Sequence, residues 1–99
     1  MIEILNLRRG KPVTPYDAYV DRRSVLGNPF PERNGNRNEV CDKYELYFEK
    51  QIRTDLRFQQ ELARLQTIHE QFGKLRLFCW CAPKRCHAET IKRWLERQL

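Results

Sequence analysis

The sequence predicts an α/β fold: one small layered domain with a short, mostly parallel sheet flanked by about three helices. Apolar runs near the two ends of the chain, residues 2–7 and 75–80, are typical of strands, and residues 37–73 between them follow a helical pattern. A helical crossover is the usual connection between parallel strands. The chain has 99 residues, enough for one core and too few for two, so residues 1–99 are expected to form a single domain.

The N-terminal third of the chain combines two short strands with a long loop. Residues 2–7 are rich in branched apolar side chains and predict a first strand. Residues 11–15 contain two prolines and predict a loop, after which residues 16–20 suit a second strand. Turn-forming residues dominate 22–36, so this segment is expected to be a structured loop.

The middle third predicts a pair of helices or one bent helix. Asn36 can cap a helix whose third position is Glu39. Apolar residues then recur at helical spacing, at Val40, Tyr44, Tyr47, Phe48 and Ile52. Thr54, followed by Asp55, offers a second cap, and the second apolar face ends at Gly73, which suits a left-handed stop.

The C-terminal third predicts a strand followed by a helix. Residues 74–80 suit a central strand, and residues 88–99 suit a helix. The expected buried stripe of this helix consists of Ile91, Trp94, Leu95 and Leu99. Trp80 lies between two cysteines of the strand end, where a core position is favoured over a platform for stacked bases.

The net charge of +6 is concentrated near the C-terminus, where residues 71–99 contain seven basic and two acidic side chains. Such a surface attracts the phosphates of a nucleotide or a nucleic acid. A solvated face that keeps a small protein in solution explains the same charges. The charge distribution alone therefore leaves both interpretations open.

Two observations bear on the compartment. No apolar stretch approaches the roughly 20 residues that span a bilayer, and residues 1–6 lack a basic region followed by a long apolar segment. We therefore expect a cytoplasmic protein without a membrane partner. In a reducing cytoplasm, the four cysteines favour free thiols, metal ligation or catalysis over a disulfide framework.

Residues 79–87 contain three of the four cysteines and one of the two histidines, at the turn between the predicted strand and helix. Helix N-termini present unpaired N–H groups and a positive potential. In one interpretation, Cys86 is a thiolate nucleophile stabilised by the helix dipole, Lys84 and Arg85, and His87 either transfers protons or, when charged, holds an anion.

Two other interpretations of this turn stay open. Three thiolates and an imidazole suit zinc, and the four candidate ligands are Cys79, Cys81, Cys86 and His87. Known zinc sites, however, usually join two ligand pairs across a long loop. Alternatively, Cys79 and Cys81 simply fill space on a strand, as free cysteines often do.

The segment Arg22–Phe30 has the composition of a ligand-binding loop. It contains arginines that suit phosphate, the Ser24 hydroxyl, Gly27, which lets backbone come close, and the Asn28 amide. Ordinary turn chemistry explains the same residues. The preceding Asp21 suits a ribose hydroxyl or an ion pair with a neighbouring arginine.

Five segments taken in order carry a resemblance to a known family: Asn6–Arg9, Tyr16–Arg22, Ser24–Phe30, Gly73–Leu75 and the motif at 79–87. They resemble domain-of-unknown-function family 4326, found in bacteria and their phages, along nearly the whole chain. Where members of that family usually have glycine after Cys-His, this chain has Ala88. The ending is also similar to uncharacterised family 488, and this likeness implies that Cys79, Cys86 and His87 are the shared elements.

Together these observations predict a pocket, formed by the Arg22–Phe30 loop and the Cys79–His87 turn, that binds a phosphate-bearing ligand, either a nucleotide or a nucleic acid. The carboxyl ends of parallel strands are where such ligands collect. The expected ligand-binding residues are Arg8, Asp21, Arg22, Ser24, Gly27, Asn28 and Arg85. Cys86 and His87 would form a reactive pair, which leaves Cys/His-based catalysis open. The alternative is a zinc-stabilised, non-catalytic interaction module, such as a phage protein that acts on a host partner.

Overall fold

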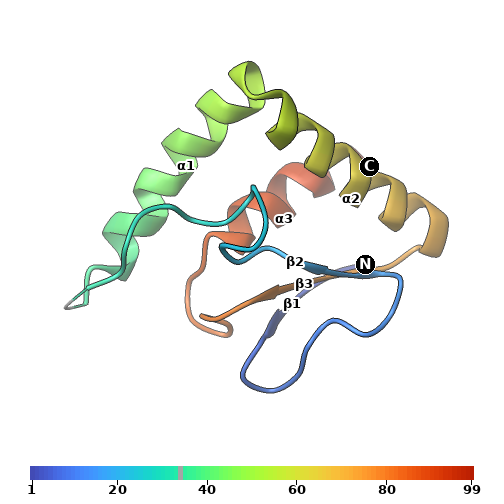
Figure 1. Cartoon of the computed structure of the whole chain (residues 1–99), viewed down its shortest axis with the longest axis horizontal. Coiled ribbons are helices and arrows are strands. Elements are labelled where there is room, and N and C mark those ends of the chain that lie inside the picture. Colours follow the sequence, from blue (N-terminus) through green and yellow to red (C-terminus); the bar gives the residue numbers. More distant parts are fainter. Residues whose placement is uncertain (34) are drawn as a thin grey trace.

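The computed structural model describes residues 1–33 and 35–99, in which three helices cover one face of a three-stranded sheet (Figure 1). The elements follow the order β1 (Ile2–Asn6), β2 (Asp17–Tyr19), α1 (Arg37–Thr54), α2 (Leu56–Phe72), β3 (Leu75–Cys79) and α3 (Ala88–Arg97). The predicted small α/β domain is confirmed.

The sheet is parallel throughout, with β3 between β1 and β2. Leu77 of β3 lies opposite Ile4 of β1 on one side and Ala18 of β2 on the other. The C-terminal strand is therefore central, as the sequence predicted. Because all three strands run in the same direction, their carboxyl ends lie at one edge of the sheet.

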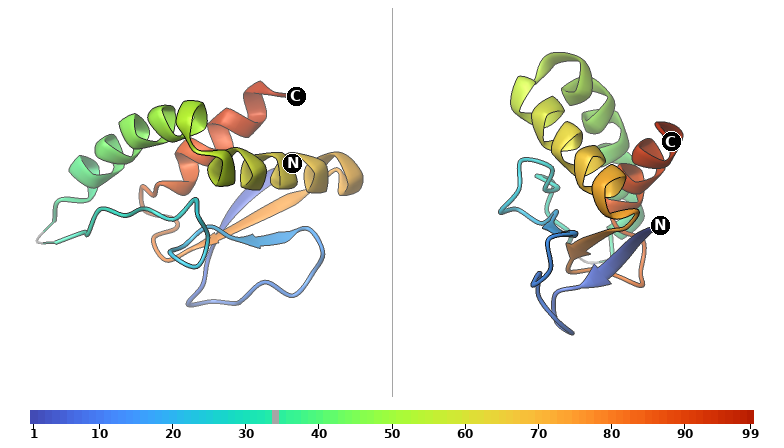
Figure 2. Two further views of the ribbon diagram at one scale, coloured as in Figure 1. Left: turned by 45° about the horizontal axis from the view of Figure 1, so that its top comes forward. Right: turned by 90° about the vertical axis from the view of Figure 1, so that its right-hand side faces the viewer.

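The two faces of the sheet have different surroundings. Leu75, Leu77 and Cys79 are fully buried and belong to the core beneath the helices. Arg76 and Phe78 alternate with them and therefore point to the opposite face. Figure 2 shows that the segment between β1 and β2 lies on the side of this second face, away from the helices. No helix covers that face within the described part of the chain.

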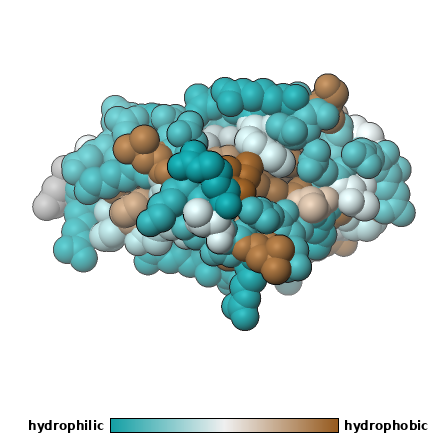
Figure 3. Space-filling model, turned by 90° about the horizontal axis from the view of Figure 1, so that it is seen from above, coloured by the Kyte–Doolittle hydropathy of each residue, from teal (hydrophilic) through white to brown (hydrophobic). Residues whose placement is uncertain are grey.

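The helix side of the molecule is largely hydrophilic. The space-filling view from above shows apolar residues only in small, separate patches (Figure 3). Within residues 1–33 and 35–99, none of the helices combines the length and the apolar character that crossing a membrane requires.

Asp55 separates α1 from α2, so the middle third is a helical pair. Its carboxylate accepts a hydrogen bond from the Phe58 N–H at 3.2 Å and caps α2. The Thr54 hydroxyl instead donates to the Lys50 carbonyl inside α1 at 2.8 Å. The N-cap of α2 is therefore Asp55 and not Thr54. Gly73 ends α2 with a φ of 66°, as predicted.

Two other helix ends depart from the predictions. Asn36 precedes α1, but its side-chain oxygen accepts from the Arg33 N–H at 2.6 Å and does not cap the helix. The last helix ends at Arg97, and Leu99 is 75% exposed. The predicted buried stripe is therefore wrong at Leu99, because the chain has left the helix before that residue, whereas Ile91 and Leu95 are buried.

The Tyr44 hydroxyl of α1 anchors the loop that follows β2. It donates to the Leu26 carbonyl at 2.7 Å in a buried position. Tyr44→Phe leaves that buried carbonyl without its donor, so we expect the free energy of unfolding to fall by about 1–3 kcal/mol. Urea denaturation measures the change. Tyr47→Phe is the matched control, and equal losses in the two variants would show that the Tyr44 hydrogen bond does not hold the loop.

Candidate functional site

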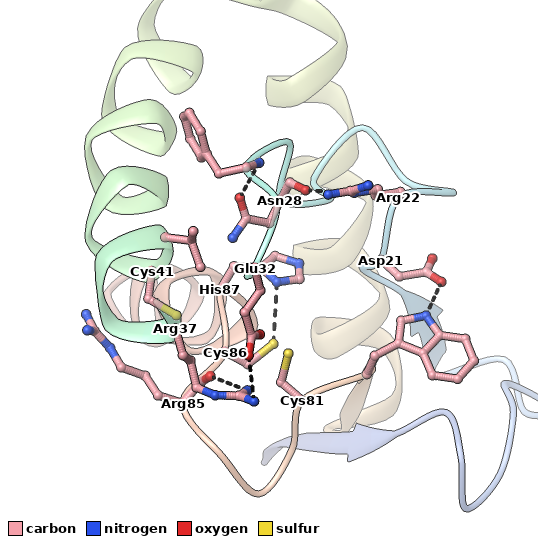
Figure 4. A pocket seen from close by; sticks show the side chains of 13 residues that line it. Asp21, Arg22, Asn28, Glu32, Arg37, Cys41, Cys81, Arg85, Cys86 and His87 are labelled. Carbon is pink, nitrogen blue, oxygen red and sulfur yellow. Dashed lines mark hydrogen bonds and ion pairs between the residues drawn. The ribbon is translucent and has the colours of Figure 1, made fainter. Parts of the chain in front are cut away.

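A hollow of about 340 Å³ lies beyond the carboxyl ends of β2 and β3 (Figure 4). Its lining comes from residues within three segments: 21–32 after β2, 37–41 at the start of α1, and 80–87 between β3 and α3. We call it the first hollow. It lies at the edge of the sheet where parallel α/β folds usually bind ligands.

The two segments singled out in the sequence meet at the first hollow. The loop after β2 contributes Asp21, Arg22 and Asn28 to the lining. The turn before α3 contributes Cys81, Arg85, Cys86 and His87. Figure 4 shows Arg22 and Asn28 on one side of the hollow and the sulfur atoms of Cys81 and Cys86 on the other.

Four predicted site residues do not line the first hollow. Arg8 is exposed in the segment that follows β1. The Ser24 oxygen accepts from the Leu26 N–H at 3.0 Å, so it shapes the loop. Gly27 packs against the Asp21 backbone, and Cys79 is fully buried in the core. For Ser24, Gly27 and Cys79, a structural role inside the fold replaces the predicted contact.

Two of the three arginines that line the hollow are already paired. Arg37 of α1 lies 2.9 Å from the Glu32 carboxylate. Arg85 lies 2.8 Å from the Asp42 carboxylate and also donates to the Asn38 carbonyl of α1. Arg85 therefore ties the turn before α3 to α1, and its charge is largely compensated within the protein.

Arg22 differs from these two arginines. Its Nε donates to the Asn28 carbonyl at 3.2 Å, which orients the guanidinium. Its two terminal nitrogens have no partner within residues 1–33 and 35–99. The Asn28 side-chain oxygen accepts from the Phe30 N–H at 2.9 Å, and the Asn28 amide nitrogen has no partner in the described chain. These nitrogens are the donors that the hollow offers to an anionic ligand.

Asp21 is engaged within the protein and holds Trp80 at the rim. The Asp21 carboxylate lies 2.8 Å from Arg23 and accepts a hydrogen bond from the Trp80 Nε1 at 3.0 Å. Burial raises the pKa of Asp21, but the hydrogen bonds from Arg23 and Trp80 outweigh it and keep the pKa below its ordinary value. Of the two predicted roles for Asp21, the structure shows the ion pair with a neighbouring arginine.

Trp80 is 49% exposed, so the predicted core position is wrong. The strand ends at Cys79, one residue earlier than expected, and the following turn swings the indole out of the sheet. Its hydrogen bond to Asp21 fixes the ring. An aromatic residue held by a hydrogen bond therefore lines part of the first hollow.

Cys86 and His87 form an oriented pair at the base of the hollow. The His87 Nε2 hydrogen-bonds the Val20 carbonyl, which can only accept, so Nε2 holds the proton. The unprotonated Nδ1 then faces the Cys86 sulfur at 3.4 Å. His87 is 7% exposed, and this burial lowers its pKa and favours the neutral ring. A neutral imidazole fixed by a backbone carbonyl can accept a proton from the neighbouring thiol.

The surroundings of Cys86 disfavour its thiolate, the form that one interpretation of the sequence expects. The single S–H of Cys86 can point to the His87 Nδ1 or to one of the Cys79 and Cys81 sulfurs, and the interactions with these two sulfurs together with burial raise the pKa of Cys86 far above its ordinary value. The same donor lowers the pKa of Cys79 to about 6 and that of Cys81 to about 7. Cys79 is fully buried, so Cys81 is the sulfur with both a lowered pKa and a place on the hollow.

The described residues do not assemble a metal site. Within residues 1–33 and 35–99, no group of three or more His, Cys, Asp or Glu side chains is arranged to hold an ion. Both ring nitrogens of His87 face protein atoms, namely the Val20 carbonyl and the Cys86 sulfur. Two of the four residues predicted as zinc ligands, Cys86 and His87, therefore face each other.

Sequence reasoning missed the contribution of α1 to the hollow. Arg37, Val40 and Cys41 line it from the first turns of that helix. Burial raises the pKa of Cys41. The spacing of residues in the sequence does not show that α1 packs beside the turn at 80–87. Residue type was therefore the only signal that could have pointed to a role for these α1 side chains in the hollow.

A family model matches residues 5–97, which is nearly the whole chain. The chain belongs to the family described as Domain of unknown function (DUF4326). The predicted membership in DUF4326 is thereby confirmed, and the likeness to family 488 stays a prediction. No curated protein and no solved structure matches this DUF4326 chain.

Proposed function

We propose that the first hollow binds a phosphate-bearing ligand, either a free nucleotide or a nucleotide unit of a nucleic acid. The observation that supports this most is the oriented Arg22 guanidinium, whose terminal nitrogens have no partner in the described chain. A planar guanidinium suits two phosphate oxygens at once. The hydrogen bond from its Nε to the Asn28 carbonyl restricts this exposed side chain and lowers the entropy lost on binding.

The size and position of the hollow support a small ligand. Its volume of about 340 Å³ lies within the range of roughly 300–1,000 Å³ typical of small-molecule sites. It also lies beside the start of α3, where the helix dipole favours an anion and where the Glu89 carboxylate already accepts from the Cys86 N–H at 3.1 Å.

The apolar part of the lining supports a base next to the phosphate. The half-exposed indole of Trp80 and the ring of Phe30 both line the hollow. Aromatic faces stack on bases at about 1–3 kcal/mol per base. A nucleotide provides both the flat apolar group and the anion that this lining suits. We expect a protein with this function to be cytoplasmic.

Arg22→Gln tests the proposal. Tryptophan fluorescence of the wild-type protein is expected to change saturably on addition of ADP. Loss of charge-assisted hydrogen bonds worth about 1.5–3 kcal/mol should weaken ADP binding about 10- to 100-fold in Arg22→Gln. Adenosine, which lacks phosphate, should bind both proteins equally. Trp80→Phe should abolish the fluorescence change and leave only the constant signal of Trp94.

Arg57→Gln is the matched control, because Arg57 is exposed on α2 and does not line the hollow. It should bind ADP like the wild type. An Arg22→Gln variant that binds ADP as tightly as Arg57→Gln would refute phosphate recognition by Arg22. A wild-type protein that shows no saturable response to ADP would refute the nucleotide proposal.

A further inference from the structure

A second hollow, of about 390 Å³, lies between the helix-free face of the sheet and the segment that follows β1. Its apolar lining includes Leu5 and Phe78, which lie opposite each other on β1 and β3. Its cationic lining consists of Arg9, Lys11 and Arg76. No carboxylate lines this hollow in the described part of the chain.

The two hollows share one wall. The turn after β3 contributes Trp80 and Cys81 to the first hollow, and Ala82 and Pro83 to the second. The Asn6 side chain fixes this turn, because its amide nitrogen donates to the Trp80 carbonyl at 3.2 Å and to the Ala82 carbonyl at 2.7 Å. A single ordered turn therefore borders both hollows.

The uncompensated charge of the second hollow comes from Arg9 and Lys11. Arg76 lies 2.6 Å from Asp17, whose side chain is fully buried, so this pair is neutral as a whole. Arg9 and Lys11 are exposed, and within residues 1–33 and 35–99 no carboxylate forms an ion pair with either of them. The hollow thus combines an apolar floor with two free cations.

We propose that one single-stranded nucleic acid occupies both hollows, with one nucleotide in each. This inference rests on the proposed function of the first hollow. Free cations beside an apolar floor complement a chain in which phosphates alternate with flat bases. The carboxylates of an acidic peptide would match the charge, but only in a nucleic acid does a flat base accompany every negative group. In a duplex the bases stack on one another and are unavailable, so the strand must be single.

The test measures binding of a short, fluorescein-labelled, single-stranded oligodeoxyadenylate by fluorescence anisotropy at several salt concentrations. The double variant Arg9→Gln/Lys11→Gln should bind the strand at least several-fold more weakly than the wild type. The plot of log association constant against log salt concentration should become less steep by about 1.4 in this double variant, since each of the two lost phosphate contacts on a single strand contributes about 0.7. ADP binding at the first hollow should be unchanged.

The control double variant, Lys50→Gln/Arg57→Gln, removes the same charge from exposed positions on α1 and α2. An equal loss of strand affinity in both double variants would overturn the inference, and so would equal competition by polyglutamate or by the duplex form of the oligonucleotide. A strand that binds no more tightly than ADP would overturn this inference but leave the proposed function of the first hollow intact. A protein that fails to bind ADP would overturn the proposed function of the first hollow.

Discussion

Gly27→Ala is expected to lower the free energy of unfolding by about 1–3 kcal/mol or more, because the new side chain overpacks a backbone contact. A Cβ at this position would lie 2.5 Å from the Asp21 carbonyl oxygen and 2.7 Å from the Arg22 Cα. Both neighbours are backbone atoms, which cannot move away as the end of a flexible side chain can. The loop must therefore distort around Asp21 and Arg22, which both line the first hollow.

Urea denaturation of Gly27→Ala measures this loss, and Gly10→Ala is the matched control. A Cβ at Gly10 would meet no atom within 4 Å, so its stability should stay within about 0.5 kcal/mol of the wild type. Gly27→Ala should also weaken ADP binding, because the distortion moves Arg22. Equal stability of the two variants would contradict the close packing between residues 21 and 27.

Cys81 is expected to be the thiol that iodoacetamide alkylates in the folded protein, with a pH midpoint near 7. The lowered pKa of about 7 means that the reactive thiolate forms as the pH rises through neutrality. An ordinary cysteine ionises near pH 8.5. Cys86→Ala removes the donor that stabilises this thiolate, so the midpoint should rise toward about 8.5. At about pH 6 the rate should fall roughly fivefold, after allowance for the greater intrinsic nucleophilicity of a more basic thiolate.

Two variants separate the hydrogen bond from packing. Cys86→Ser keeps a donor at the same position and should retain a midpoint near that of the wild type. Cys41→Ala removes a buried thiol that lines the same hollow and should leave the midpoint unchanged. A midpoint for Cys81 near 8.5 in the wild-type protein would show that Cys86 does not stabilise its thiolate. Mass spectrometry of the labelled peptides identifies the modified residue.

Elements with a strong local signal were predictable from the sequence. Residues 2–6 and 75–79 form strands because branched and aromatic side chains dominate both runs, and Gly73 ends α2 in the left-handed conformation. Element ends were less predictable, because tertiary contacts decide them. Asn36 uses its side chain on Arg33 rather than on the helix, and Leu99 lies beyond the end of α3.

The sequence predicted that the Arg22–Phe30 loop and the Cys79–His87 turn meet, because parallel strands place the carboxyl ends of β2 and β3 at one edge of the sheet. The role of each side chain there did not follow. Arg22 and Arg85 look alike in a sequence, yet only Arg85 has carboxylates of α1 beside it. Burial and the neighbouring sulfurs of Cys79 and Cys81 raise the pKa of Cys86, the thiol expected to ionise, and spacing alone does not fix the positions of these sulfurs.

Protection of Cys81 by a nucleotide tests the central proposal most directly, because Cys81 and Arg22 line the same hollow. Alkylation of Cys81 should slow several-fold at saturating ADP, and adenosine at the same concentration should protect less. Arg22→Gln should lose most of the protection by ADP, whereas Arg57→Gln should keep it. A rate of Cys81 alkylation that is unchanged at an ADP concentration that saturates the tryptophan signal would contradict nucleotide binding in the first hollow.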